Sequence, residues 1–350
     1  MAATMRAYRV PGWGLPPEVA EVAVPAPGPG QVLVRVAATG LCHSDLVMPH
    51  LPESLGRQLG WAMPFTLGHE TAGWVSALGA GATGFAEGDA VAVVSATSCG
   101  RCWFCVRGLD NDCEHGTAGR GYGADGGLAS HVLVASAREL IGLGGLDPVL
   151  AGPLTDAGAT SYHAVRRVLP KLAPGSTAVV LGAGGLGAFA VQFLRALSPA
   201  HVLAVDSNPD RLRVALDVGA HEALPGVDEG TAALVLERTG GRGADAVLDF
   251  VGVDATIAAG VAAVRRAGAF ALVGAAGGTL RSSWYGGLPR DADVFTFQGG
   301  TISDAAEAVA LAAAGLVRCD VDRFAFSAVT DAYAALREGR LRGRAVVLAP

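Results

Sequence analysis

The sequence TAVVLGAGGLGAFAVQFLRAL occupies residues 177–197 and decides the fold. A short apolar run leads into a glycine-rich turn, and a second apolar stretch of helical length follows. The turn has the spacing Gly-x-Gly-x-x-Gly and consists of Gly182, Ala183, Gly184, Gly185, Leu186 and Gly187. Between a predicted strand at 178–181 and a predicted helix at 186–197, such glycines let the backbone approach a pyrophosphate, which the helix N-terminus attracts. The stretch therefore predicts a dinucleotide site.

Asp206 predicts which dinucleotide binds there. It ends the next predicted strand, about 20 residues after the glycine-rich turn. A carboxylate at this place accepts hydrogen bonds from the adenosine ribose and repels a 2′-phosphate. Arg211 follows closely and could partly neutralise such a phosphate. We expect NAD as the cofactor, with Asp206 and Arg211 among its binding residues.

Outward from this stretch, the chain divides into two parts. After Pro153, apolar runs predict strands at 178–181, 202–205, 246–250 and 269–273. Helices are predicted at 186–197, 209–218, 231–238 and 256–266. This alternation is typical of an α/β domain with a doubly wound parallel sheet. Residues before about 150 instead contain short predicted strands at 31–37, 71–78, 89–94 and 130–135, which predict a distorted barrel or sandwich.

The composition limits the possible partners. The chain has 350 residues, 51% of them hydrophobic, and a formal net charge of −6. This balance argues against a nucleic-acid partner, which needs clustered positive charge. Glycines interrupt the longest uncharged stretch, so we predict no membrane span. The N-terminus has no apolar core of signal-peptide length, and we expect a cytoplasmic protein.

Four of the six cysteines lie close together. Cys99, Cys102, Cys105 and Cys113 have the spacing C-x2-C-x2-C-x7-C, which in a chain without a signal peptide indicates a metal site rather than disulfides. Four thiolates can close a tetrahedron around Zn²⁺ and leave no ligand position open. An iron–sulfur motif of this kind would place its fourth cysteine three residues on, before a proline. We predict a structural zinc site.

Several motifs together resemble the zinc-dependent medium-chain alcohol dehydrogenases, and most closely the bacterial NAD-dependent secondary-alcohol dehydrogenases. In chain order they are Cys42-His43-Ser44-Asp45, Gly68-His69-Glu70, the four cysteines, Pro153-Leu154-Thr155-Asp156-Ala157-Gly158, the glycine-rich turn and Asp206. The resemblance covers essentially the whole chain. It implies a GroES-like β-barrel catalytic domain at 1–156 and 298–350, and a Rossmann domain at 157–297. It also implies a homodimer or homotetramer.

The resemblance further implies a catalytic zinc held by Cys42, His69 and Asp156, with Glu70 as a competing ligand. Many members have cysteine where this chain has Asp156, which leaves the formal charge of the ligand set unchanged. The counterpart of Asp45 orients the ligating histidine. Ser44 resembles the hydroxyl that passes the proton of the alcohol onward, and Val47 replaces a histidine that continues this relay in many members. His43 and Arg344 are expected near the cofactor pyrophosphate.

The substrate implied by the resemblance is a small alcohol or the corresponding carbonyl compound. Ser95 stands where many members carry a bulky aromatic, which favours a secondary or aryl alcohol. A polyol is an alternative substrate. A zinc-free quinone or enoyl reductase of the same superfamily is an alternative activity, but such enzymes lack the cysteine cluster and the Cys42 and His69 ligands. A non-enzymatic zinc- and NAD-binding protein is a third possibility, which the presence of Ser44 beside a full ligand set opposes.

Overall fold

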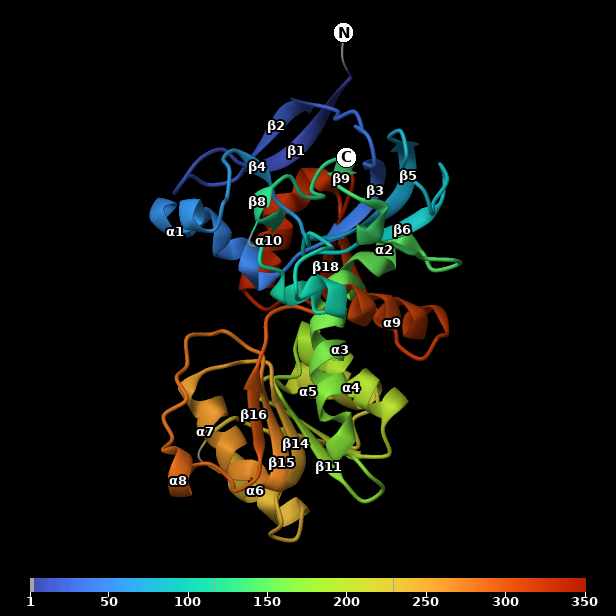
Figure 1. Ribbon diagram of the computed structural model, residues 1–350. Coiled ribbons are helices and arrows are strands. Elements are labelled where there is room, and N and C mark those ends of the chain that lie inside the picture. Colours follow the sequence, from blue (N-terminus) through green and yellow to red (C-terminus); the bar gives the residue numbers. More distant parts are fainter. Residues whose placement is uncertain (1–2, 117, 229) are drawn as a thin grey trace. The chain divides into compact units, whose positions relative to one another are not determined.

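The computed structural model describes residues 3–116, 118–228 and 230–350. The chain forms two units (Figure 1). The first, here the catalytic unit, comprises Met1–Ala159 and Gly299–Pro350, and the second, the Rossmann unit, comprises Thr160–Gln298. The sequence predicts these boundaries at 156/157 and 297/298. Among the described residues, no helix is long and apolar enough to cross a membrane.

The Rossmann unit is built on one six-stranded parallel sheet. Its strand order is β13-β12-β11-β14-β15-β16, as in a dinucleotide-binding fold. The strands are β11 (Thr177–Leu181), β12 (His201–Asp206), β13 (Glu222–Pro225), β14 (Ala244–Asp249), β15 (Val264–Leu272) and β16 (Asp293–Thr296). The central strands β11 and β14 are entirely buried, which explains the apolar runs at 178–181 and 246–248 within them.

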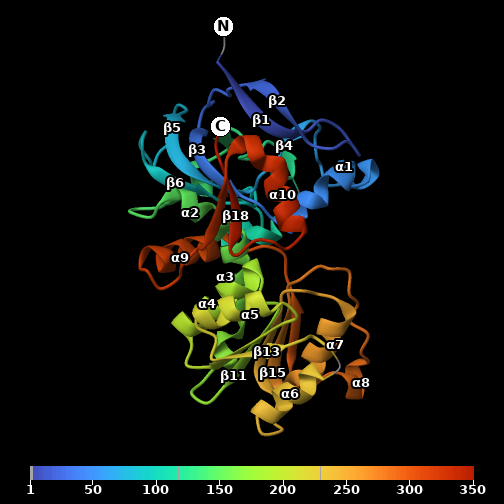
Figure 2. The ribbon, with the colours of Figure 1, turned by 180° about the vertical axis from the view of Figure 1, so that it is seen from behind.

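Helices cover both faces of this sheet (Figures 1 and 2). They are α4 (Gly185–Leu197), α5 (Pro209–Asp217), α6 (Thr231–Arg238), α7 (Asp254–Ala263) and the short α8 (Trp284–Gly287). α4 packs against α5, and α6 packs against α7. Helix α3 (Ala157–Val168) extends across the boundary into this unit. α5 begins as the sequence suggests, since the Asn208 side chain caps it and Pro209 occupies its first turn.

One predicted helix is wrong at its C-terminal end. The sequence predicts a helix over 256–266, whereas α7 ends at Ala263 and β15 begins at Val264. Val264 pairs with Ala244 on β14, and Arg265 Nε donates to a buried Asp245 oxygen at 2.7 Å. Pairing with the neighbouring strand therefore overrides the local helix propensity of this segment.

The catalytic unit is a strand-rich, GroES-like domain. A seven-stranded sheet has the order β10-β6-β5-β3-β18-β17, with β9 also paired to β3, and a second sheet has the order β2-β1-β4. The strands are β1 (Thr4–Val10), β2 (Glu18–Ala23), β3 (Val32–Gly40), β4 (Phe65–Thr66), β5 (Glu70–Leu78), β6 (Ala90–Val93), β7 (Gly119–Arg120), β8 (Gly123–Ala124), β9 (His131–Val134), β10 (Leu140–Gly142), β17 (Val321–Phe324) and β18 (Arg344–Leu348). The helices are α1 (Glu53–Gln58), α2 (Pro148–Ala151), α9 (Ile302–Ala313) and α10 (Val329–Arg337).

The C-terminal segment completes the catalytic unit. β18 pairs antiparallel with β3 and parallel with β17, so residues from the two ends of the chain share one sheet. Helix α10 packs against β18 and against the short helix η1 (His43–Leu46). Its buried residues Tyr333 and Leu336 join Leu41, Met48 and Phe65 in one core. This core supports the segment that carries Cys42 and Ser44.

Candidate metal and cofactor sites

The structure brings together four predicted ligands from separate segments of the catalytic unit. Cys42 follows β3 and precedes η1, His69 and Glu70 lie at the start of β5, and Asp156 lies between the short helix η6 (Gly152–Thr155) and α3. One ligand atom from each of the four lies within 4.8 Å of all the others. The cluster therefore has the composition of a zinc site, with sulfur, nitrogen and carboxylate donors.

Distances within the cluster fit the tetrahedral coordination of a zinc ion. His69 Nε2 lies 3.4 Å from Asp156 Oδ2. Metal–ligand bonds of about 2.0–2.2 Å give a tetrahedral nitrogen–oxygen edge of about 3.4 Å. On the other side of the ring, His69 Nδ1 lies 3.1 Å from Asp45 Oδ1. Asp45 also accepts a hydrogen bond from the Cys42 backbone N–H at 3.0 Å, so one carboxylate orients the segments of two ligands.

Glu70 is fully buried and forms an ion pair with Arg344 from β18. Arg344 Nη2 also donates to the Leu41 carbonyl at 3.0 Å. A Cβ atom at Gly40 would lie 2.1 Å from Glu70 Oε2, so this glycine makes room for the carboxylate. Burial raises the pKa of Glu70 to about 7, although Arg344 acts in the opposite direction. Arg344 is thus engaged at the candidate zinc site, and its expected role at the pyrophosphate stays a prediction.

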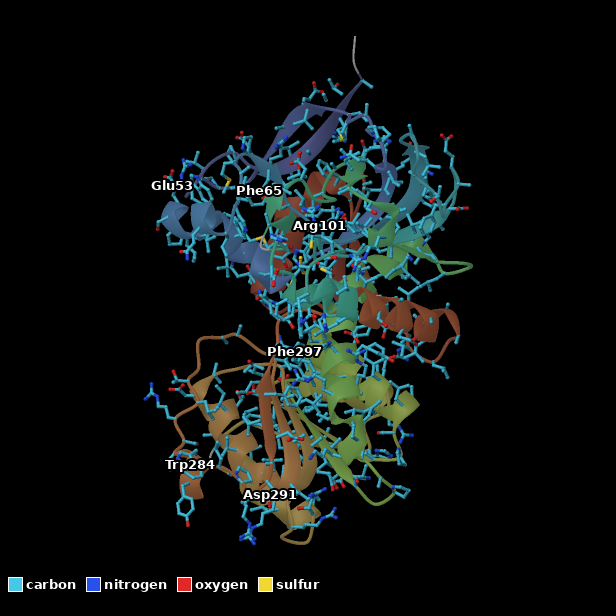
Figure 3. All side chains as sticks on the ribbon, viewed as in Figure 1. Glu53, Phe65, Arg101, Trp284, Asp291 and Phe297 are labelled. Atoms are coloured by element: carbon cyan, nitrogen blue, oxygen red, sulfur yellow. The ribbon has the colours of Figure 1, made fainter. Side chains whose placement is uncertain are left out.

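The four remaining clustered cysteines form the second candidate metal site, in the lobe that contains Arg101 (Figure 3). Cys99 Sγ lies 4.0 Å from Cys105 Sγ, and Cys102 Sγ lies 3.9 Å from Cys113 Sγ. Zinc–sulfur bonds of about 2.3 Å give tetrahedral edges of about 3.8 Å. All four protein ligands are sulfur, so the geometry fits a closed structural zinc site.

Backbone N–H groups donate hydrogen bonds to these sulfurs, which favours the thiolate form that binds a cation. The N–H of Cys102 donates to Cys99 Sγ at 3.3 Å, and the N–H of Cys105 donates to Cys102 Sγ at 3.5 Å. Cys113 Sγ accepts from the N–H groups of Cys99 and His115. The hydrogen bond from Cys105 is the main reason that the pKa of Cys102 falls to about 6. Stabilised thiolates are the form that binds zinc.

Ser44 and His43 lie on η1, directly after the ligand Cys42. The Ser44 hydroxyl lies 3.4 Å from the hydroxyl of Tyr122. The Tyr122 ring lies 4.5 Å from the His69 ring, and burial raises the pKa of this phenol well above its usual value. His43 is exposed, and its expected contact with the cofactor stays a prediction.

In the Rossmann unit, the glycine-rich turn has the geometry that the sequence predicts. It joins β11 to α4, with Gly182 at φ 87° and Gly184 at the N-cap of α4. A Cβ atom at Gly187 would lie 1.9 Å from the Gly182 carbonyl oxygen, so the close approach of helix and turn requires glycine. These two positions leave the N-terminus of α4 accessible to a phosphate in the manner of dinucleotide-binding folds.

Asp206 ends β12 beside this turn. Its carboxylate accepts a 2.9 Å hydrogen bond from the Ala183 N–H and a 2.8 Å hydrogen bond from the Asn208 N–H. Each carboxylate oxygen retains a further acceptor position, as ribose recognition requires. The half-exposed Arg211 lies 3.8 Å from Asp206 through Nη1. The arrangement fits the adenosine half of NAD.

Comparisons with known proteins identify the family of this chain. The model of the alcohol dehydrogenase GroES-like domain matches residues 28–144, and that of the zinc-binding dehydrogenases matches residues 185–314. An NAD-dependent alcohol dehydrogenase from Sulfolobus acidocaldarius is 32% identical over 98% of this chain and 99% of its own length. The chain belongs to the zinc-type medium-chain alcohol dehydrogenases.

Solved structures of this alcohol dehydrogenase family include close matches to the whole fold. The alcohol dehydrogenase of Aeropyrum pernix has a TM-score of 0.89 and 32% identity, and the match covers 98% of this chain and 99% of that one. Acetophenone reductase from Geotrichum candidum, solved with NAD, has a TM-score of 0.85 and 28% identity, over 99% and 97% of the two chains. The predicted fold, the zinc and NAD cofactors and the oxidoreductase class are confirmed.

Proposed function

We propose that this alcohol dehydrogenase interconverts secondary or aryl alcohols and their carbonyl products with NAD. The observation that supports this substrate class is that the cluster of Cys42, His69 and Asp156 lies beside aromatic rings. The Tyr122 ring lies 4.5 Å from His69 and 6.3 Å from Trp61, which in turn packs edge-to-face on Phe65 at 5.8 Å. An apolar wall at a zinc site favours a substrate with an apolar or aromatic substituent.

Different residues of the chain serve different roles in the reaction. Bound zinc supplies Lewis acidity toward the alcohol oxygen, and bound NAD supplies the hydride acceptor. Cys42, His69 and Asp156 hold the metal, and Asp45 fixes the orientation of the His69 ring. We assign to Ser44 the acceptance of the alcohol proton, and to His43 and Arg344 contacts with the cofactor. Glu70 is the alternative ligand, because its buried Oε2 has no hydrogen-bond partner in the described structure.

Ser95 supports the substrate assignment. It is buried, with 8% of its surface exposed, and it is the second residue after β6. A small side chain here leaves room for a second substituent on the carbinol carbon. With NAD⁺, we expect kcat/KM for 1-phenylethanol to exceed that for ethanol and for sorbitol by at least about tenfold, which corresponds to about 1.4 kcal/mol.

A bulky substitution tests this reading directly. Ser95→Phe should lower kcat/KM for 1-phenylethanol more than for ethanol, while Ser95→Ala, which preserves the space, should leave their ratio close to that of the wild type. Ethanol or sorbitol as the preferred substrate of the wild type would contradict the proposal. An unchanged ratio in Ser95→Phe would show that this residue does not shape the pocket.

We also propose that the protein is a homodimer or homotetramer. Trp284, which is labelled in Figure 3, and Tyr285 are each 81% exposed and form an edge-to-face pair at 5.4 Å. Exposed aromatic pairs of this kind gain free energy when a partner covers them. Light scattering should give two or four times the chain mass of 35.2 kDa. A mass of one chain at micromolar concentration would contradict this assignment.

A cytoplasmic location is the third element of the proposal. All six cysteines are free thiols, and four of them converge on the candidate structural zinc site. Zinc–thiolate sites persist where the environment keeps thiols reduced. Fractionation of the native cells should recover the activity with cytoplasmic marker enzymes, and recovery with the periplasmic or secreted fraction would contradict the assignment.

A further inference from the structure

The short loop at 119–123 is built to hold Tyr122 in one place. The Tyr122 N–H donates to the Gly119 carbonyl at 2.8 Å, and the Gly119 N–H donates to the Tyr122 carbonyl at 2.9 Å. Gly121 and Gly123 on either side have φ angles of 75° and 82°. A Cβ atom at Gly123 would lie 2.4 Å from the Trp61 ring. Backbone pairing and tight packing therefore fix the direction in which the Tyr122 ring extends.

The hydroxyl group of the fixed Tyr122 ring lies next to the Ser44 hydroxyl. The two oxygens are 3.4 Å apart, and the ring lies against His69 on the same side. A tyrosine keeps its proton at neutral pH, because the ordinary pKa of a phenol is about 10. We propose that Tyr122 is a positioning residue that donates a hydrogen bond to Ser44 Oγ and so fixes the orientation of the serine hydroxyl.

The hydrogen bond from Tyr122 determines which further hydrogen bonds the Ser44 hydroxyl can form. A serine hydroxyl has one hydrogen to donate and two acceptor positions. When Tyr122 occupies one acceptor position, the other stays available for the proton of the alcohol, and the serine's own hydrogen is free to be donated onward. No proton leaves Tyr122 in this scheme. The inference rests on the proposed role of Ser44 as the acceptor of the alcohol proton.

Val47 makes such positioning more important in this chain. It is the C-cap residue of η1, three residues after Ser44, and it is 62% exposed. A valine side chain has neither a donor nor an acceptor. Val47 therefore offers the Ser44 hydroxyl no hydrogen bond, and the described contact that orients this hydroxyl is the one from Tyr122.

The test is a double-mutant cycle of Tyr122→Phe and Ser44→Ala on the full-length holoenzyme, with one secondary alcohol and NAD⁺. Ser44→Ala should lower kcat about 100-fold or more. Tyr122→Phe should lower kcat about 3- to 10-fold at nearly unchanged KM, the range expected for one neutral hydrogen bond. In the Ser44→Ala background, Tyr122→Phe should change kcat by less than about 1.5-fold, because its partner is gone.

A second measurement does not depend on activity. In the zinc-loaded, cofactor-free protein with ¹³C-labelled tyrosine, Ser44→Ala should shift the phenolic carbon signal of Tyr122, which is assigned by its disappearance in Tyr122→Phe. The other four tyrosines provide internal references. Tyr162→Phe, a change in a buried ring that packs on Phe193, is the matched control and should keep kcat within about 1.5-fold of the wild type.

The outcomes separate the inference from the proposed function. An equal effect of Tyr122→Phe in both backgrounds, or an unmoved Tyr122 signal, would overturn the positioning role while leaving the role of Ser44 intact. A Ser44→Ala variant as active as the wild type would overturn the role of Ser44, and the inference with it. Zinc content and melting temperature equal to those of the wild type confirm that the variants are folded.

Discussion

Asp156 supplies one of the two negative charges that face the candidate catalytic zinc, and Cys42 supplies the other. Asp156→Ala should therefore reduce the zinc content from two ions per chain to one and abolish alcohol oxidation. NAD⁺ binding should persist, because the glycine-rich turn and Asp206 belong to the other unit. Metal analysis combined with calorimetric NAD⁺ titration measures both. Asp156→Cys, which preserves the charge, should retain the ion, and two zinc ions in Asp156→Ala would move the ligand role to Glu70.

We expect the carboxylate of Asp206 to determine the choice between NAD and NADP. Charge-assisted hydrogen bonds to the ribose contribute about 1.5–3 kcal/mol, and a 2′-phosphate loses one of them and adds repulsion. We expect the wild type to prefer NAD⁺ by at least about 100-fold in kcat/KM, or about 2.7 kcal/mol. Asp206→Gly should reduce this ratio, with Arg211 then favouring the phosphate. Asp210→Asn, on the exposed first turn of α5, is the matched control. A ratio unchanged by Asp206→Gly would exclude the assignment.

At the scale of single residues, the sequence could not predict contacts between residues that are far apart in the chain. The zinc ligands follow motifs, so Cys42, His69 and the cysteine cluster are recognisable from spacing and resemblance. The ion pair of Glu70 with Arg344 and the contact of Ser44 with Tyr122 have no local signal, since each joins segments that only the folded sheet brings together. Asp110, which accepts from Arg138 and from the Ile302 N–H at 3.4 Å, is a further example.

Among the elements, the cysteine lobe at 99–113 contains little regular structure, only two short 3₁₀ turns. Its Trp103 and Val106 are exposed rather than buried in a core, so we expect the metal to be the main source of its order. Cys102→Ser should lower the melting temperature by at least about 5 °C, as the loss of roughly 2 kcal/mol would do in a domain of this size. Turnover per folded molecule should change far less. Cys319→Ser, outside both clusters, is the control, and a native melting temperature with one zinc fewer would contradict the structural role.

Strands and helices differ in how well the sequence predicted them. The central strands β11 and β14 were predicted because they are buried on both faces and therefore contain the apolar runs at 178–181 and 246–248. The edge strands β13 and β16 were not, because each is four residues long and only partly buried. The end of α7 was wrong because pairing with β14, a tertiary effect, converts Val264 and Arg265 to strand.

At the scale of the whole molecule, the cysteine lobe at 99–113 and the glycine-rich turn with Asp206 belong to different units, so the effects of zinc and NAD⁺ on their local stability should separate. Hydrogen exchange on the zinc-stripped protein measures this. Added zinc should protect the amides of the lobe at 99–113, and added NAD⁺ should protect those around 182–187 and Asp206, because each ligand stabilises the state it binds. Protection of the cysteine lobe by NAD⁺ alone would contradict this separation.

The return of the chain to its first sheet, where β18 lies beside β3, has a consequence for synthesis on the ribosome. The Rossmann unit is one continuous stretch and can fold as soon as it emerges, since domains generally fold as units during translation. The catalytic unit cannot be completed until β18 has been synthesised. Its zinc ligands emerge early, but the strand that carries the Arg344 partner of Glu70 is made long afterwards. The nascent chain therefore carries a complete nucleotide-binding domain before it has a complete metal centre, and the cell must keep the thiols of Cys42 and the four clustered cysteines reduced throughout that interval.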